Sequence, residues 1–338
     1  MTGSVQPLLS VRNLKTYFMQ DEGTVRAVDG VSFEVAEGAT LGIVGESGCG
    51  KSITARSILR IVDRPGRIME GEIHFRRPPA DGGTGATIDL AKLDPNGADM
   101  RAIRGAEIAL IFQEPMSSFS PVHSIGNQIV EAILLHQPVS PRQARAQAVE
   151  MLRRVGVSSP EQRVDQLAHQ LSGGLRQRAM IAMALSCRPT LLIADEPTTA
   201  LDVTTQTQIL ELMRQLQKED GMAIMLITHD LGVIAEMATD VAVMYLGRVV
   251  EQAPVDAIFH DPRHPYTRAL LRSIPRMRAR TRERLTPIAG AVPHPYDRPA
   301  GCPFHPRCTE FMAGRCDAQA PTLKPVADRH AVSCFLYE

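Results

Sequence analysis

The 338-residue chain contains no tryptophan, and aromatic residues make up only 4% of it. A surface that binds sugars or bases by stacking on aromatic rings is therefore not expected. The charge is also balanced, because 37 lysines and arginines offset 37 aspartates and glutamates. A nucleic-acid partner would favour a basic face, so this balance gives no support for one.

Long apolar runs are missing as well. No stretch reaches the length of about 18 apolar residues that marks a candidate membrane-spanning helix. The richest one, GMAIMLITHDLGVIAEMATDVAVMYL (221–246), is interrupted by His229, Asp230, Glu236 and Asp240. The N-terminal MTGSVQPLLSVRNL lacks the basic and then apolar pattern of a signal peptide. We therefore expect a cytosolic protein that does not span a membrane.

Strand and helix patterns alternate along most of the chain. Strands are predicted over 8–18, 28–38, 39–45, 71–75, 106–113, 190–195 and 222–229. Helices are predicted from Lys51, over much of 124–170, over 204–219 and in DLGVIAEMA, before a closing hairpin in DVAVMYLGRVVEQ. The first two strands read as antiparallel, but strands that alternate with helices predict an α/β fold with a largely parallel sheet.

Two segments depart from this alternation. RRPPADGGTGA (76–86) is rich in proline and glycine and is expected to be a loop. After about residue 275 the chain becomes basic and then proline-rich. We place a boundary near 275–285, which gives a main domain over 1–275 and a C-terminal extension over 276–338.

The segment GESGCGKS (45–52) fits the phosphate-binding pattern G-x-x-x-x-G-K-[ST]. A buried strand precedes it and a helix follows, which is the context that this loop requires. Its glycines let backbone N–H groups converge on phosphate oxygens, its lysine supplies charge, and its last serine can bind Mg²⁺. The residues expected to hold a nucleoside triphosphate are Gly45, Ser47, Gly48, Cys49, Gly50, Lys51, Ser52 and Ile53.

A second candidate segment is TLLIADEPTTALD (190–202), an apolar strand that ends in two carboxylates. Asp195 lies where a carboxylate can hold Mg²⁺ through water. Glu196 is one residue further and can take a proton from an attacking water. The alternative is a capping pair at the end of a strand.

The third segment is LSGGLRQR (171–178), in which Ser172, Gly173 and Gly174 open a helix. A serine and two glycines at a helix N-terminus can bind phosphate. A single domain has no second triphosphate to fill this place, and a bare Ser-Gly-Gly is by default an ordinary N-cap.

Three motifs follow one another along the chain: GESGCGKS, then LSGGLRQR, and shortly after it LLIADEP. This series resembles that of ABC ATPases, and the resemblance extends over about residues 8–255. The resemblance implies a P-loop ABC-type nucleotide-binding domain. Such a domain has a RecA-like parallel core, an antiparallel β subdomain and a helical subdomain at about 114–185. It also implies that two ATPase subunits enclose two ATP molecules, with the signature of one closing on the P-loop of the other.

Further residues receive roles from this resemblance. Phe18 matches the aromatic residue that stacks on adenine, with Tyr17 as the neighbouring alternative. Gln113 matches the glutamine that senses Mg²⁺ and the attacking water and faces the membrane partner. Asp202, with Leu201, matches the loop that crosses the dimer interface, and His229 matches the histidine that contacts the γ-phosphate.

Three further segments are similar to the D-type ATPase subunit of the oligopeptide/dipeptide permease branch of ABC importers. They are IFQEPMSSFSPVHSIGNQI, HPYTRALLRSIP and ERLTPIAGAVPHPYDRPAGCPFHPRC. This similarity implies an ATPase subunit that powers the import of di- or oligopeptides. It would pair with a different, F-type ATPase chain, two membrane-spanning permease subunits and an extracytoplasmic solute-binding protein. Its place would be the cytoplasmic face of the bacterial inner membrane. Leu175 departs from the general signature, where glutamine is the consensus.

Other functions remain open at this stage. Relatives in this branch import oligosaccharides, opines or nickel with similar ATPases. A soluble ABC ATPase that is not coupled to transport is a rival of another class, although one P-loop and no heptad run disfavour it. A non-enzymatic metal scaffold with a vestigial ATP site is disfavoured by Glu196 and His229.

Four of the six cysteines crowd the last few dozen residues with the spacing C-x5-C-x7-C-x17-C: Cys302, Cys308, Cys316 and Cys334. Structural zinc usually shows tight C-x2-4-C pairs, whereas looser thiolate sets suit iron–sulfur clusters. The similarity to the permease branch implies a [4Fe–4S] cluster. Zn²⁺ and free thiols or a disulfide stay as alternatives. A metal centre would stabilise a short, proline-rich extension.

Overall fold

The computed structural model describes residues 6–77, 85–114, 118–199, 201–273 and 288–338. The chain forms two compact units, and each is built from several stretches of sequence. The first unit comprises Met1–Leu9, Val35–Thr40 and His74–Ile227, and the second comprises Ser10–Glu34, Leu41–Ile73 and Thr228–Glu338. Among the described residues, no helix is both long enough and apolar enough to cross a membrane.

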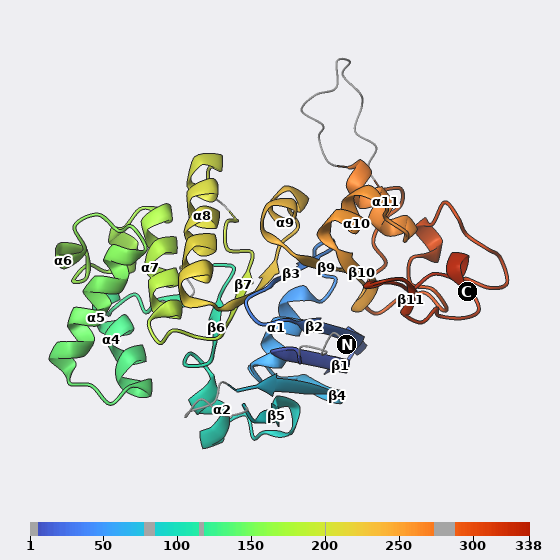
Figure 1. Cartoon of the computed structure of the whole chain (residues 1–338). Coiled ribbons are helices and arrows are strands. Elements are labelled where there is room, and N and C mark those ends of the chain that lie inside the picture. The colour runs from blue at the N-terminus through green and yellow to red at the C-terminus, as the bar shows by residue number, and fades with distance from the viewer. Residues whose placement is uncertain (1–5, 78–84, 115–117, 200, 274–287) are drawn as a thin grey trace, which may run out of the picture. The chain divides into compact units, whose positions relative to one another are not determined.

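The helices and strands follow the predicted order (Figure 1). The strands are β1 Leu9–Gln20, β2 Gly23–Val35, β3 Thr40–Val44, β4 Gly66–Arg76, β5 Thr87–Asp89, β6 Ile108–Ile111, β7 Leu191–Asp195, β8 Ala223–Ile227, β9 Asp240–Tyr245, β10 Arg248–Pro254, β11 Lys324–Ala327 and β12 His330–Val332. The α-helices are α1 Lys51–Ile58, α2 Ala98–Ile103, α4 Ile125–His136, α5 Pro141–Arg154, α6 Pro160–Arg163, α7 Gly173–Leu185, α8 Val203–Asp220, α9 Leu231–Met237, α10 Val255–His260 and α11 Pro265–Arg272.

The first unit holds the strand order β6-β7-β8, and both strand pairs are parallel. All five residues of β7 and of β8 are buried, which explains their unbroken apolar sequence. The green helices α4, α5, α6 and α7 lie together in Figure 1. Serine side chains cap three of these helices. Ser124 caps α4, Ser140 forms a capping box with Gln143 on α5, and Ser172 caps α7.

The second unit contains β1, β2 and most of β4 in the order β2-β1-β4. It also contains β3, which pairs in parallel with β9, and the predicted hairpin of β9 with β10. The helix α1 begins directly after the glycine-rich loop that follows β3. The expected strand, loop and helix at 39–58 are therefore confirmed.

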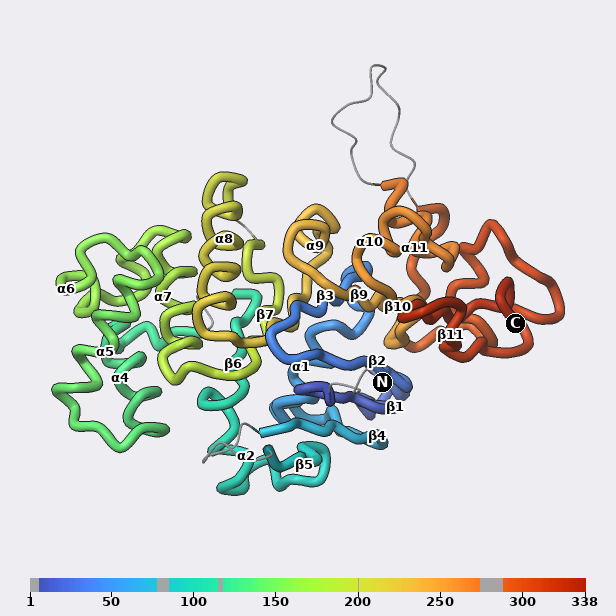
Figure 2. The backbone as a smooth tube through the Cα atoms, in the orientation of Figure 1, coloured from blue at the N-terminus to red at the C-terminus, as the bar shows by residue number. Residues whose placement is uncertain are grey.

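The C-terminal extension continues the sheet of the second unit. β12 pairs antiparallel with β10, and β11 pairs with β12, so the red end of the chain lies beside β10 (Figure 2). The sequence predicted neither strand. Phe304, Val332 and Phe335 are buried, so this segment carries more core than its proline content indicated. The boundary predicted near 275–285 falls entirely within 274–287, and the loop predicted at 76–86 falls partly on 78–84. Both of those stretches lie outside the described residues.

Candidate functional site

The glycine-rich loop is packed too closely for side chains at two of its positions. Gly50 has φ 99°, and a Cβ there would lie 2.1 Å from the carbonyl oxygen of Ala27. A Cβ at Gly45 would lie 2.2 Å from the carbonyl oxygen of Met244. The neighbouring main chain therefore requires glycine at both ends of the loop.

Lys51 lies within this loop and not in solvent, with only 5% of its surface exposed. Its Nζ donates to the carbonyl oxygens of Gly45 at 2.7 Å and Glu46 at 3.2 Å. Ser47 and Gly48 at the tip are exposed, whereas Ser52 and Ile53 on the first turn of α1 are half-buried. Burial raises the pKa of the Cys49 thiol, so it stays protonated near neutral pH. The loop thus presents a lysine, backbone N–H groups and a helix start at one place.

The two candidate aromatic residues on β1 point to opposite faces of the strand, as alternation requires. Thr16 shares its face with Phe18, and its hydroxyl is 2.8 Å from that of Ser57 on α1, the helix after the phosphate loop. Tyr17 points the other way and donates to Asp29 at 2.6 Å. Burial and this hydrogen bond raise the pKa of Tyr17 to about 12. Phe18 is therefore the aromatic residue on the side of the phosphate loop's helix.

In the first unit, two predicted side chains meet at the carboxyl ends of β6 and β7. Nε2 of Gln113 donates to Oε2 of Glu196 at 3.1 Å, and the Thr199 hydroxyl donates to the same oxygen at 2.9 Å. Asp195, the last residue of β7, is 7% exposed. Glu196 follows with φ 48°, in the left-handed region that costs a residue with a side chain about 1–2 kcal/mol. This backbone turn directs Asp195 and Glu196 differently.

The segment LSGGLRQR forms the start of α7. The Oγ of Ser172 accepts the N–H of Leu175 at 3.4 Å, so this serine is an N-cap, as the alternative interpretation also held. Gly173 and Gly174 form the first turn. A Cβ at Gly174 would lie 2.9 Å from the Cγ2 of Thr205, so glycine lets α8 approach.

Asp202 caps α8 through the same threonine. Its carboxylate accepts the Thr205 N–H at 2.9 Å and the Thr205 hydroxyl at 2.7 Å, which lowers the pKa of Asp202. Gln177 on α7 donates to the carbonyl oxygen of Pro197, just after the two carboxylates. The sequence reasoning missed Gln177 and Thr199. The only signal for Gln177 was its place on the signature helix.

His229 lies two residues after the end of β8, belongs to the second unit and is exposed. Asp230 caps α9 by accepting the N–H of Gly232 at 2.8 Å. The predicted residues are thus divided between the units. The first unit contains Gln113, Asp195, Glu196, Ser172 and Asp202, and the second contains the phosphate loop, Phe18 and His229.

The four cysteines of the extension are all free thiols. The N–H of Cys302 donates to the carbonyl oxygen of Cys316 at 2.8 Å. Burial raises the pKa of Cys302 to about 11, and the nearby charges of Cys316, Cys334 and Cys308 add to this shift. The thiols therefore share one small region. Within the described ranges, however, no three His, Cys, Asp or Glu side chains are arranged to hold a metal ion.

Comparisons with known proteins identify the family of this chain. A family model described as ABC transporter matches residues 28–199. A second, described as Oligopeptide/dipeptide transporter, C-terminal region, matches residues 250–316. The dipeptide transport ATP-binding protein DppD of Escherichia coli (strain K12) is 47% identical over 97% of this chain and 96% of its own. The oligopeptide transport ATP-binding protein AppD of Bacillus subtilis (strain 168) is 49% identical over 98% of this chain and 97% of its own.

Solved structures show the same fold. The dimeric post-hydrolysis state of the ATP-binding cassette MJ0796, bound to ADP and Pi, matches with a TM-score of 0.63 and 26% identity. It covers 73% of this chain and 98% of that one. The cassette fold predicted from the sequence is thus confirmed, while a metal-stabilised extension is not shown. The phosphate loop, the two carboxylates and the signature helix therefore belong to an ATP-binding subunit of the ABC transporter family, in its oligopeptide/dipeptide branch.

Proposed function

We propose that this chain binds and hydrolyses ATP to power an importer of dipeptides or oligopeptides. The observation that carries the proposal is the identity of 47–49% with dipeptide and oligopeptide transport ATP-binding proteins over nearly the whole chain. It includes the C-terminal region matched by the transporter-specific model.

The proposed chemistry gives each predicted residue a role. Lys51 and the loop N–H groups bind the β- and γ-phosphates, and His229 contacts the γ-phosphate. Glu196 takes the proton of the attacking water, and its hydrogen bonds from Gln113 and Thr199 orient the carboxylate. Phe18 stacks on the adenine ring.

The oxygen donors of the site suit Mg²⁺, which prefers carboxylate, hydroxyl and amide oxygens. Ser52, Gln113 and the buried Asp195 would hold it, and it would offset charge on the phosphates. Ser172, Gly173, Gly174 and Asp202 would face the ATP held by a second ATPase subunit, proposed to be a different chain of the F type.

Coupling to the membrane is proposed through the segment that follows Gln113. Apolar side chains are exposed along it, with 76% of Val122 and 73% of Leu135 accessible. Exposed apolar side chains of this kind fit contact with permease subunits. The chain would lie at the cytoplasmic face of the inner membrane, and an extracytoplasmic solute-binding protein would deliver the peptide.

The test is ATP hydrolysis by the reconstituted complex, with the solute-binding protein loaded with dipeptide, oligopeptide, oligosaccharide, opine or nickel. Peptide alone should stimulate turnover, and stimulation only by another solute would refute the peptide assignment. Glu196→Gln should abolish turnover and leave ATP bound. Glu211→Gln, an exposed carboxylate on α8, is the matched control and should turn over normally. Unchanged turnover in Glu196→Gln would refute the proton-acceptor role.

We also propose that Cys302, Cys308, Cys316 and Cys334 hold a [4Fe–4S] cluster, with Zn²⁺ as the alternative. Support comes from four free thiols in one small region, whose repulsion when ionised to thiolates a cationic centre would relieve. When bound, the cluster would supply structural cross-linking of the extension. Anaerobic purification followed by iron, sulfide and zinc analysis tests this. About four irons per chain support the cluster, one zinc supports the alternative, and no metal refutes both.

A further inference from the structure

Glu46, the second residue of the phosphate loop, is held by two residues from far along the chain. Its carboxylate accepts two hydrogen bonds from Arg307, at 2.7 and 3.0 Å. Its backbone N–H donates to the hydroxyl of Tyr266 at 2.9 Å. Both partners lie within 250–316, the region matched by the transporter-specific model and not by the ABC transporter model. The general cassette motifs therefore do not account for these contacts.

Arg307 is itself held by several partners besides Glu46. Its side chain is 3% exposed. Its Nε donates to the carbonyl oxygen of Ala289 at 3.1 Å, and a terminal nitrogen donates to the Tyr245 hydroxyl at 3.3 Å. Its backbone N–H donates to the carbonyl oxygen of Phe304 at 3.0 Å. A guanidinium with this many partners loses little further freedom when it grips a carboxylate.

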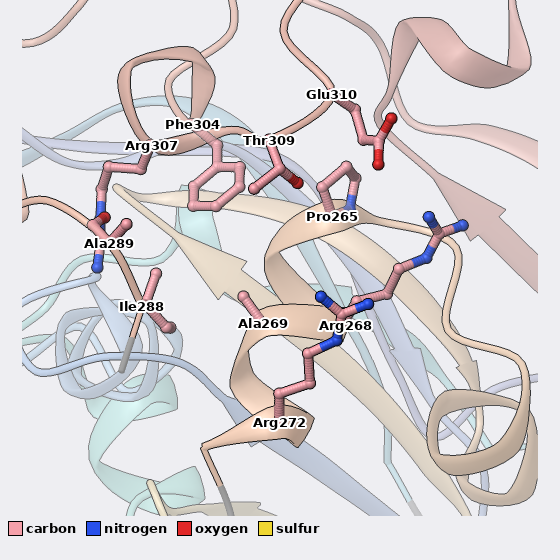
Figure 3. A pocket seen from close by; sticks show the side chains of 10 residues that line it. All are labelled: Pro265, Arg268, Ala269, Arg272, Ile288, Ala289, Phe304, Arg307, Thr309 and Glu310. Carbon is pink, nitrogen blue, oxygen red and sulfur yellow. The ribbon is translucent and has the colours of Figure 1, made fainter. Parts of the chain in front are cut away.

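Aromatic rings brace the same place. The ring centroids of Tyr245 and Tyr266 are 4.7 Å apart, and Phe304 lies 5.3 Å from each of them. Figure 3 shows Arg307 beside Ala289, apart from Arg268 and Arg272, which project from α11 on the other side of the cavity of about 140 Å³. Arg307 thus lines this cavity from the side opposite α11, while its guanidinium donates to Glu46 of the phosphate loop.

The pair matters for ATP because the ligand is a polyanion. Lys51, the cation of the loop, donates to the carbonyl oxygen of Glu46, so the backbone of residue 46 also positions the lysine. A Glu46 carboxylate without its arginine would add a negative charge beside the phosphates, in a place where 25% of its side chain is exposed. Removal of one partner from such a pair leaves the other charge uncompensated.

We propose that Arg307 is a positioning residue of the ATP site, which neutralises Glu46 and fixes the phosphate loop. The nucleotide affinity of the cassette therefore depends on the cysteine-bearing extension, because Arg307 lies between Cys302 and Cys308. Arg307 acts through Glu46 and touches no reacting atom.

The test is ATP binding by the purified full-length chain, followed by steady-state kinetics of the assembled transporter. Arg307→Gln should weaken ATP binding by about tenfold or more, and KM for ATP should rise more than kcat falls. The double variant Arg307→Gln/Glu46→Gln removes both charges. It should recover to within about threefold of the unmodified chain. Arg307→Lys keeps the charge without the paired geometry and should be intermediate.

The matched control is Arg329→Gln in the same extension. Arg329 also grips a carboxylate, that of Asp240, with two bonds at 2.6 and 2.8 Å, but 62% of its side chain is exposed and Asp240 is outside the phosphate loop. The ATP affinity of the Arg329→Gln variant should equal that of the unmodified chain. Unchanged affinity in Arg307→Gln would overturn the proposal. A double variant as weak as Arg307→Gln would also overturn it, because the loss would then reflect damage to the fold. Should Arg307→Gln fail to fold, Arg307→Lys against the double variant gives the same comparison.

Discussion

Glu251 on β10 is fully buried, and its removal should loosen the C-terminal extension. Its Oε1 accepts from Nε2 of His330 at 2.8 Å and from the N–H of Arg263 at 2.6 Å. Its Oε2 accepts the N–H of His264 at 2.9 Å. One side chain therefore satisfies donors from β12 and from the turn before α11.

The size of the effect follows from these three donors. An orphaned buried donor costs about 1–3 kcal/mol, and breaking a buried charged network costs about 3–5 kcal/mol in total. Glu251→Ala should therefore lower the free energy of unfolding of this unit by about 3–5 kcal/mol. Glu251→Gln keeps one acceptor oxygen and should lose less.

The assay is urea denaturation followed by circular dichroism, with limited proteolysis to locate the loosened segment. The midpoint of Glu251→Ala should fall by on the order of 1–2 M. Arg329→Gln breaks an exposed ion pair and should cost under about 1 kcal/mol. Equal midpoints for Glu251→Ala and Arg329→Gln would refute the reasoning, since burial would then not decide the cost.

Three further predictions concern the ATP site and its support. Gly50→Ala should abolish ATP binding, because the new Cβ would lie 2.1 Å from a carbonyl oxygen. Gly48→Ala has open space around its Cβ and φ 77°, so it should cost only about 1–2 kcal/mol of stability. Equal ATP affinities of the two variants would contradict this. Phe18→Ala should raise KM for ATP several-fold and Tyr17→Phe should not, and the reverse pattern would assign the stacking to Tyr17. Burial lowers the pKa of His264 to about 3, so between pH 6.5 and 3 the unfolded chain binds a proton that the folded chain does not. The free energy of unfolding should therefore decrease as the pH is lowered through this range, by up to about 1.4 kcal/mol per pH unit. His264→Asn keeps an acceptor for the Tyr266 N–H at the start of α11, so its urea midpoint should depend less on pH.

The sequence predicted the parts of the site that depend on local rules. Glu196 and Gln113 were placed at strand ends, and the carboxyl ends of neighbouring parallel strands must lie close together. Their hydrogen bond therefore follows from the strand pattern. The glycine loop likewise has a fixed spacing with a known physical purpose.

Contacts between distant segments could not be predicted in this way. Glu46 and Arg307 are 261 residues apart along the chain, and nothing in the sequence near either residue specifies its partner. The strands β11 and β12 are short, and β11 contains a proline, so neither shows a clear alternating pattern. Both strands form because β12 can make backbone hydrogen bonds to the edge of β10, and β11 to β12. This is an effect of tertiary structure and not of the local sequence.

The pairing of β12 with β10 also has a consequence for the synthesis of this protein. His330–Val332 is made after the β9–β10 hairpin, so the edge of β10 stays open until β12 has been made and can pair with it. An uncovered strand edge is a template for association with other chains. β12 thus protects this edge, and variants in which β12 cannot pair with β10 should aggregate even where their ATP-binding motifs are intact.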